Sequence, residues 1–280
     1  MSLEGYATNE GTARYVERFR DTAAENHFRF EQKLWLSSIG IGTYLGGSDE
    51  ETDRAYTDAL VRAVELGANV IDTAANYRFQ RSERSVGAAL ERLTTAGKFA
   101  REEIVVCTKG GYLPFDGAPP AGRDAVRAYI EETFIKTGIA APEEIAAGSH
   151  CMTPRYLENQ IAQSLRNTGL ACLDVYYIHN PETQLSVVSR AEFETRLRAA
   201  FVQLERERAL GRIRTYGVAT WNGFRAQPND RAFLSLERMA ELAREAGGGV
   251  GANDGGDDDA HGFRFIQVPF NLSMPEALVL

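Results

Sequence analysis

The sequence predicts one α/β domain of the parallel-barrel class. Short apolar runs of the kind that form buried strands alternate with longer segments of helical period, and this order implies parallel strands joined by right-handed crossovers. The length of 280 residues suits this class, because an α/β barrel typically takes about 250 residues as one domain.

The expected elements lie between residues 37 and 269. Strands are predicted at 37–43, 69–73, 104–108, 173–179, 215–220 and 263–269. Helices are predicted at 48–67, 82–93, 153–169, 190–210 and 231–246. Ser48 is expected to begin the first helix as its N-cap, and Thr153 followed by Pro154 marks the start of the third. Gly211 is expected to close the fourth.

The N-terminal segment precedes this alternation. Residues 1–32 are polar and aromatic with a weak helical period, and we assign them to an extension before a barrel domain of residues 33–280. The extension is expected to be an arm that packs on the barrel, with a lid or a subunit contact as the alternative.

Two further segments interrupt the pattern. Residues 113–150 follow the third strand, on the rim where a substrate should lie, so Tyr112, Phe115 and Tyr129 are candidates for a pocket wall. An insertion that packs on itself is an equal alternative. Residues 247–262 contain runs of glycine and aspartate and are expected to form a solvated loop.

Four polar side chains, Asp72, Tyr77, Lys109 and His179, lie at or just past the ends of predicted strands. Such ends converge on one rim of a parallel barrel. An unperturbed tyrosine titrates near about 10, so it is a poor acid unless a cation lowers its pKa, and Lys109 can supply that cation. Asp72 would keep the ammonium charged, while His179 would donate a hydrogen bond to a carbonyl oxygen. These residues predict proton delivery to a carbonyl.

Each of the four also has a purely structural explanation. Asp72 could cap the following helix, Tyr77 could be an ordinary loop aromatic, and Lys109 could be a solvated lysine. His179 could be a core histidine. Their joint order on successive strand ends favours the functional interpretation.

In this order the four residues resemble the catalytic tetrad of the aldo-keto reductases. Segments that are similar to the same family follow at 39–43, 76–87, 174–181, 211–218 and 267–271. The resemblance runs from about residue 36 to the C-terminus. It implies a (β/α)8 TIM barrel that reduces aldehydes or ketones with NADPH, the hydride coming from the nicotinamide and the proton from Tyr77.

The resemblance also implies a cofactor site. The family holds the nicotinamide carboxamide with a Ser-Asn pair after strand five and with a glutamine on strand six. Gln267 matches the glutamine, but Ala219 and Thr220 stand where the pair is expected, so the Thr220 hydroxyl and the Asn222 amide are the candidate substitutes.

Other residues complete the predicted site. Gly42 and Thr43, in the segment that is similar to the family's first strand, are further candidates for binding the cofactor, and Trp221 and Tyr44 are candidates for the pocket wall. No GxGxxG pattern follows a strand, so a Rossmann site is not predicted, and no metal site is predicted either.

The C-terminal part of the sequence is shorter than the family pattern. The family continues with two further βα units, which grip the adenosine 2′-phosphate, so we expect a barrel truncated after strand six. An unclosed barrel would expose the edges of its first and last strands, which favours association with another chain. A non-catalytic barrel module or regulatory subunit that has lost cofactor binding is therefore the alternative function.

Composition limits the partners. The net charge is −8 and arginines alternate with glutamates, which argues against a nucleic-acid partner. No apolar run reaches the roughly 18 residues of a membrane span. Three cysteines, Cys107, Cys151 and Cys172, show no CxxC spacing, and no apolar leader precedes the fold, which favours a reducing cytoplasm. Cys107 and Cys172 lie in or beside predicted strands and are expected to be buried thiols. The expected partner is a small carbonyl substrate.

Overall fold

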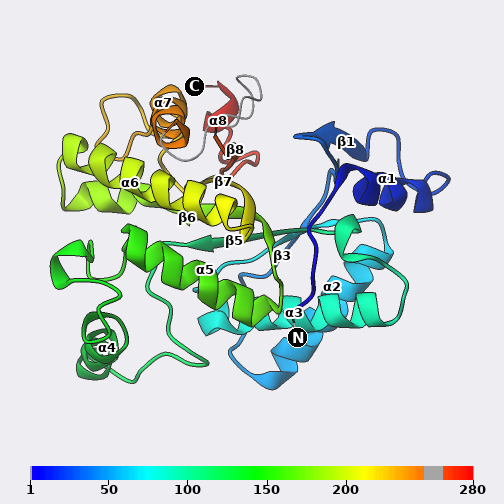
Figure 1. Ribbon diagram of the computed structural model, residues 1–280, viewed down its shortest axis with the longest axis horizontal. Coiled ribbons are helices and arrows are strands. Elements are labelled where there is room, and N and C mark those ends of the chain that lie inside the picture. Colours follow the sequence, from blue (N-terminus) through cyan, green and yellow to red (C-terminus); the bar gives the residue numbers. More distant parts are fainter. Residues whose placement is uncertain (1, 249–260, 280) are drawn as a thin grey trace. The chain divides into compact units, whose positions relative to one another are not determined.

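The computed structural model describes residues 2–248 and 261–279 (Figure 1). The chain divides into two compact units. Unit 1 comprises Met1–Thr108, Pro114–Pro119 and Ala162–Val175, and unit 2 comprises Lys109–Leu113, Pro120–Ile161 and Tyr176–Leu280. Because the unit boundaries fall inside two strands and one helix, these elements contribute residues to both units.

The observed elements follow the predicted alternation. In unit 1 they are α1 (Asn9–Arg18), β1 (Phe28–Glu31), β2 (Leu34–Ser37), β3 (Ile41–Gly42), α2 (Glu50–Glu65), β4 (Val70–Asp72), η1 (Tyr77–Gln80), α3 (Arg81–Thr95) and η2 (Arg101–Glu103). The elements shared by both units are β5 (Val105–Gly110), α5 (Pro154–Thr168) and β6 (Leu173–His179). In unit 2 they are α4 (Arg123–Ile130), η3 (Glu131–Ile135), η4 (Pro142–Glu144), η5 (Pro181–Ser186), α6 (Arg190–Ala209), β7 (Ile213–Ala219), α7 (Leu236–Gly247), β8 (Phe263–Gln267) and α8 (Glu276–Val279).

The sheet order is that of successive βα units. Six strands are hydrogen-bonded in the order β3-β4-β5-β6-β7-β8. The predicted parallel pairing is confirmed for β3 with β4, β4 with β5, and β7 with β8. Asp72 lies opposite Gly42 on one side and Cys107 on the other, so the end of β4 is fixed within unit 1.

Two local predictions are wrong at their boundaries. Asp49, not Ser48, caps α2, because its Oδ1 accepts the Thr52 amide at 2.8 Å. Helix α7 begins at Leu236 rather than at residue 231, since the Ser235 hydroxyl accepts the Arg238 amide and sets the start there.

The segment predicted as one strand at 37–43 is split. Ser37 ends β2, which pairs antiparallel with β1, and only Ile41 and Gly42 join the parallel sheet. Glu31 lies opposite Leu34, and the two residues between them have φ values of 51° and 64°. This is the geometry of a type I′ hairpin turn. The turn consists of Gln32 and Lys33 rather than the usual Asn-Gly, so the sequence carries no hairpin signal.

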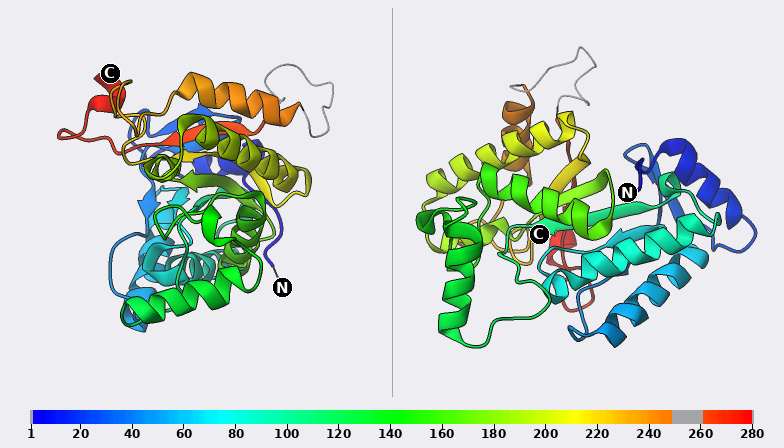
Figure 2. Two further views of the ribbon diagram at one scale, coloured as in Figure 1. Left: turned by 90° about the vertical axis from the view of Figure 1, so that its left-hand side faces the viewer. Right: turned by 60° about the horizontal axis from the view of Figure 1, so that its bottom comes forward.

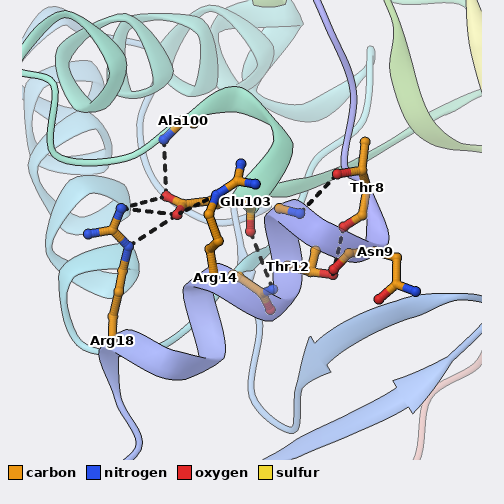
Figure 3. A network of polar contacts seen from close by, with 9 residues as sticks. Thr8, Asn9, Thr12, Arg14, Arg18, Ala100 and Glu103 are labelled. Carbon is orange, nitrogen blue, oxygen red and sulfur yellow. Dashed lines mark hydrogen bonds and ion pairs between the residues drawn. The ribbon is translucent and has the colours of Figure 1, made fainter.

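Helix α1 is fastened to unit 1 by the buried carboxylate of Glu103 (Figure 3). Arg18 Nε and Nη2 donate to Glu103 Oε1 at 3.1 and 3.0 Å, and the Ala100 amide donates to Oε2 at 3.0 Å. A Cβ on Gly11 would lie 2.2 Å from the Glu102 carbonyl oxygen, so only glycine allows this close approach of α1 to η2. The N-terminal segment is therefore an integral part of unit 1, while the predicted domain boundary at residue 32 stays a prediction.

Aromatic side chains fill part of the core of each unit. In unit 1 the buried Tyr15 ring contacts Phe19, Phe28 and Phe99, and its hydroxyl donates to the Val64 carbonyl at 2.6 Å. In unit 2 the rings of Phe201 on α6, Tyr216 on β7 and Phe263 on β8 contact one another. Helices α2 and α3 lie side by side in unit 1, as do α6 and α7 in unit 2 (Figure 2).

Three remaining predictions concern loops and thiols. Most of the 113–150 insertion belongs to unit 2, where Tyr129 and Phe134 contact each other, so part of the insertion does pack on itself. Residues 249–260 of the predicted 247–262 loop lie outside the described residues. Cys107, Cys151 and Cys172 are buried and form no disulfide, which confirms the prediction of buried thiols for Cys107 and Cys172. Within the described ranges, no helix combines the length and the apolar character needed to cross a membrane.

Candidate functional site

Asp72 and Tyr77 form one part of the predicted site, inside unit 1. Asp72 ends β4, and its carbonyl oxygen accepts the Thr43 hydroxyl at 3.3 Å. Tyr77 begins η1, where its amide donates to the Ala74 carbonyl and its ring packs edge-on against Tyr44 at 4.9 Å between centroids. Burial raises the pKa of Tyr77, and the charge of Asp72 and the neighbouring Tyr44 raise it further. Within unit 1 the phenol therefore keeps its proton and is a weak acid.

The residues after Tyr77 adopt an unusual backbone. Arg78, Phe79 and Gln80 have φ values of 47°, 58° and 70°, so three consecutive non-glycine residues occupy the left-handed region. Each such residue costs on the order of 1–3 kcal/mol and persists only where the surroundings impose it. The sequence gives no sign of this turn, because glycine and asparagine are absent from it.

The side chain of Arg78 holds this turn. It is 1% exposed, its Nε donates to the Gly47 carbonyl at 2.7 Å, and its Nη2 contacts Asp53 Oδ1 at 2.5 Å. Its guanidinium also lies 4.9 Å from the ring centroid of Tyr56. Arg81 binds the other oxygen of Asp53 at 2.6 Å. One carboxylate thus fixes both ends of the left-handed turn that follows Tyr77.

Lys109 and His179 form the other part, inside unit 2. Lys109 lies in β5 and is 1% exposed, and His179 is the last residue of β6. Burial lowers the pKa of His179 to about 3, with further lowering by the positive charge of Lys109 and by His150. The imidazole of His179 is therefore neutral near pH 7, so it can donate one hydrogen bond without carrying a charge.

His150 and Tyr112 surround His179, and only Tyr112 was among the residues predicted for the pocket. His150 is fully buried, and its Nε2 lies 2.8 Å from the His179 carbonyl oxygen. The ring of Tyr112 packs edge-on against both imidazoles, at 5.3 Å from each. Tyr112 was predicted as a pocket residue, but His150 appeared only as the end of an insertion. No local pattern marks it, because its partner lies 29 positions along the chain.

The loop after β7 is organised by a carboxylate that the sequence analysis also missed. Glu182 is buried, and its Oε1 accepts the Thr220 hydroxyl at 2.6 Å and the amides of Trp221 and Asn222 at 3.2 and 3.1 Å. The Thr220 oxygen in turn accepts the Gly223 amide at 2.7 Å. Among the described residues, Glu182 Oε2 has no hydrogen-bond partner.

This arrangement bears on the predicted carboxamide site. The Thr220 hydroxyl is engaged with Glu182 and Gly223, whereas the Asn222 side chain is exposed and Gln267 is half-buried at the end of β8. The Gln267 carbonyl accepts the Thr220 amide at 2.9 Å, which keeps the two strand ends in register within unit 2. The two amide side chains therefore suit a polar ligand better than the Thr220 hydroxyl does.

The two cofactor candidates on the first parallel strand lie in unit 1. Gly42 is opposite Asp72, and nothing lies within 4 Å of a Cβ placed on it. Thr43 is buried, and its hydroxyl lies 2.8 Å from the Thr73 hydroxyl oxygen. Its carbonyl accepts the Ser82 hydroxyl at 2.7 Å. Thr43 thus ties the end of β3 to β4 and to α3.

Comparison with known proteins places these features in context. The model of the aldo/keto reductase family matches residues 38–227. A methylglyoxal reductase from Escherichia coli, described as NADH-specific, is 29% identical over 191 residues, which cover 66% of this chain and 49% of that protein. A D-threo-aldose 1-dehydrogenase from a Pseudomonas species is 28% identical over 170 residues, covering 60% and 44%. The chain spans about half the length of the curated relatives it matches.

Solved structures agree on the fold. The glycerol dehydrogenase of Gluconobacter oxydans has a TM-score of 0.52 at 20% identity, covering 90% of this chain and 57% of its own. A thermostable aldo-keto reductase has a TM-score of 0.51 at 16% identity, covering 87% and 62%. The predicted fold class, an α/β barrel of this type, is confirmed.

Proposed function

The chain belongs to the aldo/keto reductase family, and we propose that it is an NADPH-dependent oxidoreductase that reduces an aldehyde or a ketone to an alcohol. Tyr77 would give the proton, Lys109 would lower its pKa, and Asp72 would orient Lys109. His179 would hydrogen-bond the carbonyl oxygen. The observation that carries the proposal is the burial of Lys109 at a strand end, since lysine is almost never fully buried unless the ammonium is used or paired.

The residues present fit a nicotinamide. Gln267 and Asn222 offer amide groups that could hold its carboxamide, while Thr220 acts through the loop that Glu182 organises. When bound, the nicotinamide supplies a hydride to the carbonyl carbon. The family match leaves the choice of nucleotide open, and the name of the relative from Escherichia coli specifies NADH. NADPH is therefore proposed together with a direct comparison of the two nucleotides.

The protein's own contribution is the proton and the polarisation of the substrate. During reduction the carbonyl oxygen would take up the electron pair of the C=O π bond, and Tyr77 Oη would transfer its proton to that oxygen. Lys109 stabilises the resulting tyrosinate, which regains a proton from water. A neutral His179 donates a hydrogen bond to the same oxygen without competing for the proton, which is consistent with its lowered pKa.

The test is reduction of aldehydes by the purified chain, followed as loss of reduced-nucleotide absorbance with NADPH and NADH in parallel. The panel contains methylglyoxal and simple aldoses, because these are named for two relatives. We expect Tyr77→Phe to lower kcat by at least about 10²-fold, the contribution typical of general acid catalysis, with nucleotide affinity unchanged. Equal turnover by Tyr77→Phe, or nucleotide-independent turnover, would contradict the assignment. Absence of nucleotide binding would favour the non-catalytic module.

A further inference from the structure

His150 lies at the centre of a hydrogen-bonded chain inside unit 2. The chain runs from Arg196 on α6, through Gln184 on η5, to His150 and then to the main chain of His179. We propose that His150 is a positioning residue for His179, held by Gln184 and Arg196 in the neutral form that carries its proton on Nε2. The functional part of this inference rests on the proposed function.

The direction of donation along these hydrogen bonds follows from Arg196. A guanidinium can only donate hydrogen bonds, so the Gln184 atom that lies 2.8 Å from Arg196 Nη1 must be the amide oxygen. Arg196 is itself fixed by Glu192, whose Oε1 lies 2.8 Å from its Nε. The orientation of the Gln184 amide is therefore set by chemistry and not by a choice between two equivalent assignments.

The Gln184 nitrogen then determines the tautomer of His150. It lies 2.9 Å from His150 Nδ1 and 3.1 Å from the His150 carbonyl oxygen, and as an NH2 group it donates to both. Nδ1 must accept, so the single proton of the neutral ring sits on Nε2. Nε2–H donates to the His179 carbonyl oxygen at 2.8 Å. Burial lowers the pKa of His150 to about 4, which agrees with a neutral ring.

The neighbouring residues pack closely around the hydrogen bond between His150 Nε2 and the His179 carbonyl oxygen. A Cβ on Gly111 would lie 2.8 Å from both His150 Nε2 and the His179 carbonyl oxygen, and Gly111 has φ +147°. The Cys151 amide donates to the Gly111 carbonyl at 2.8 Å, which pins the loop after His150 to the end of β5. On the other side the Tyr112 hydroxyl accepts a hydrogen bond from the side-chain amide of Asn180, Nδ2, at 3.2 Å. His150 touches the backbone of His179 and is buried, so its effect on a substrate must pass through His179.

The first measurement is the 15N spectrum of the histidine rings in the full chain near pH 7. We expect His150 to show a protonated Nε2 and an unprotonated Nδ1, with the signals assigned by their loss in His150→Gln. Gln184→Glu places an acceptor opposite Nδ1 and should move a proton there, whereas Gln184→Met should leave the ring without a fixed tautomer. A wild-type ring protonated on Nδ1 would overturn the inference.

The second measurement is kinetic. His150→Leu removes the donor and should lower kcat for carbonyl reduction by about 10²-fold, the loss expected for a misplacement near 1 Å, with nucleotide affinity kept within about twofold. In His150→Gln the amide nitrogen reaches the place of Nε2, so most of the activity should return. His27→Leu is the matched control, because His27 Nε2 also binds a backbone carbonyl, that of Gly67 at 3.0 Å, but in unit 1.

The outcomes separate this inference from the proposed function. Equal kcat losses in His150→Leu and His27→Leu, or no rescue by His150→Gln, would overturn the positioning role. If the wild-type chain reduces no carbonyl compound, the proposed function fails, and the ring signals of His179 become the readout. A change in those signals in His150→Leu but not in His150→Gln or His27→Leu then supports positioning, and no change in His150→Leu refutes it. If His150→Leu does not fold, the position of the ring proton in the wild type and in Gln184→Glu still decides.

Discussion

The segments that follow β4 and β6 are built alike but held differently. Each contains a 3-10 turn and left-handed residues, namely Arg78–Gln80 within η1 before α3 and Asn180 directly before η5. The turn in unit 1 is held by ion pairs from Arg78 and Arg81 to one carboxylate. The backbone next to the turn in unit 2 is held by the neutral imidazole of His150. Charge therefore positions Tyr77, whereas hydrogen bonding with a defined tautomer positions His179.

The largest expected difference between the units is in their response to acid. The folded pKa values of His150 and His179 are lowered to about 4 and about 3, against about 6.5 in an unfolded chain. Below pH 6.5 the unfolded chain binds protons that the folded chain does not, so stability falls as pH drops from 6.5 toward 4. For His150 alone, the free energy of unfolding should fall by about 3 kcal/mol.

Unit 1 contains a group with the opposite tendency. Burial raises the pKa of Glu83, which accepts hydrogen bonds from Thr108 and Asn167. Its contribution to stability is fully present below its unfolded pKa and is lost as pH rises through the folded value. Amide hydrogen exchange between pH 7 and 4, corrected for intrinsic rates, should show unit 2 losing protection first. Equal protection of unit 2 at both pH values would contradict the pKa shifts.

The next effect concerns the arginine clamp after Tyr77, formed by the ion pairs of Arg78 and Arg81 with Asp53. Arg78→Met keeps the length of the side chain but removes the ion pair, the bond to Gly47 and the charge over Tyr56. We expect about 3 kcal/mol of destabilisation, the low end for breaking a buried pair, since Asp53 is 30% exposed and keeps Arg81. Urea unfolding measures the loss. Arg54→Met removes an exposed pair with Glu50 and should cost no more than about 0.5 kcal/mol; similar losses in both variants would show that the clamp is not special.

A smaller effect is expected at the loop that Glu182 holds. Glu182→Leu leaves the Thr220 hydroxyl and the Asn222 backbone amide without their acceptor, whereas the Trp221 amide keeps Asn180 Oδ1 at 2.8 Å. This change should cost about 2 kcal/mol and weaken nucleotide binding. Glu182→Gln keeps an acceptor oxygen at the same place and should cost under about 1 kcal/mol. Denaturant unfolding and nucleotide titration of both variants give the comparison, and identical values for Leu and Gln would rule out the hydrogen bonds as the cause.

The smallest expected difference separates steric crowding from backbone strain. Gly111→Ala would place a Cβ against His150 and His179, whereas Gly97→Ala has φ +66° but nothing within 4 Å. Both should lose about 1 kcal/mol through the backbone, and Gly111→Ala should lose a further 1 kcal/mol or so through crowding. Equal destabilisation in Gly111→Ala and Gly97→Ala would mean that His150 and His179 can shift to make room for the added methyl group.

Sequence patterns predicted what depends on near neighbours. The alternation of apolar runs placed β4, β5, β6 and the residues at their ends, because strand and helix periods are local properties. The hairpin at Gln32 and Lys33 was not predicted, because these two residues lack the usual turn preference. The roles of Glu182 and His150 were not predicted for another reason. Their hydrogen-bond partners are about 30 to 40 positions away in the sequence, so only the folded structure shows these contacts.

The buried cysteines described above can serve as built-in probes of opening in each unit. Cys107 and Cys172 are buried in unit 1 and Cys151 in unit 2, and none takes part in a disulfide. A thiol reagent can alkylate such a side chain only while the surrounding structure is open. Pulsed alkylation followed by peptide mass spectrometry would thus time the opening of the two units separately in the unmodified protein, without an introduced label.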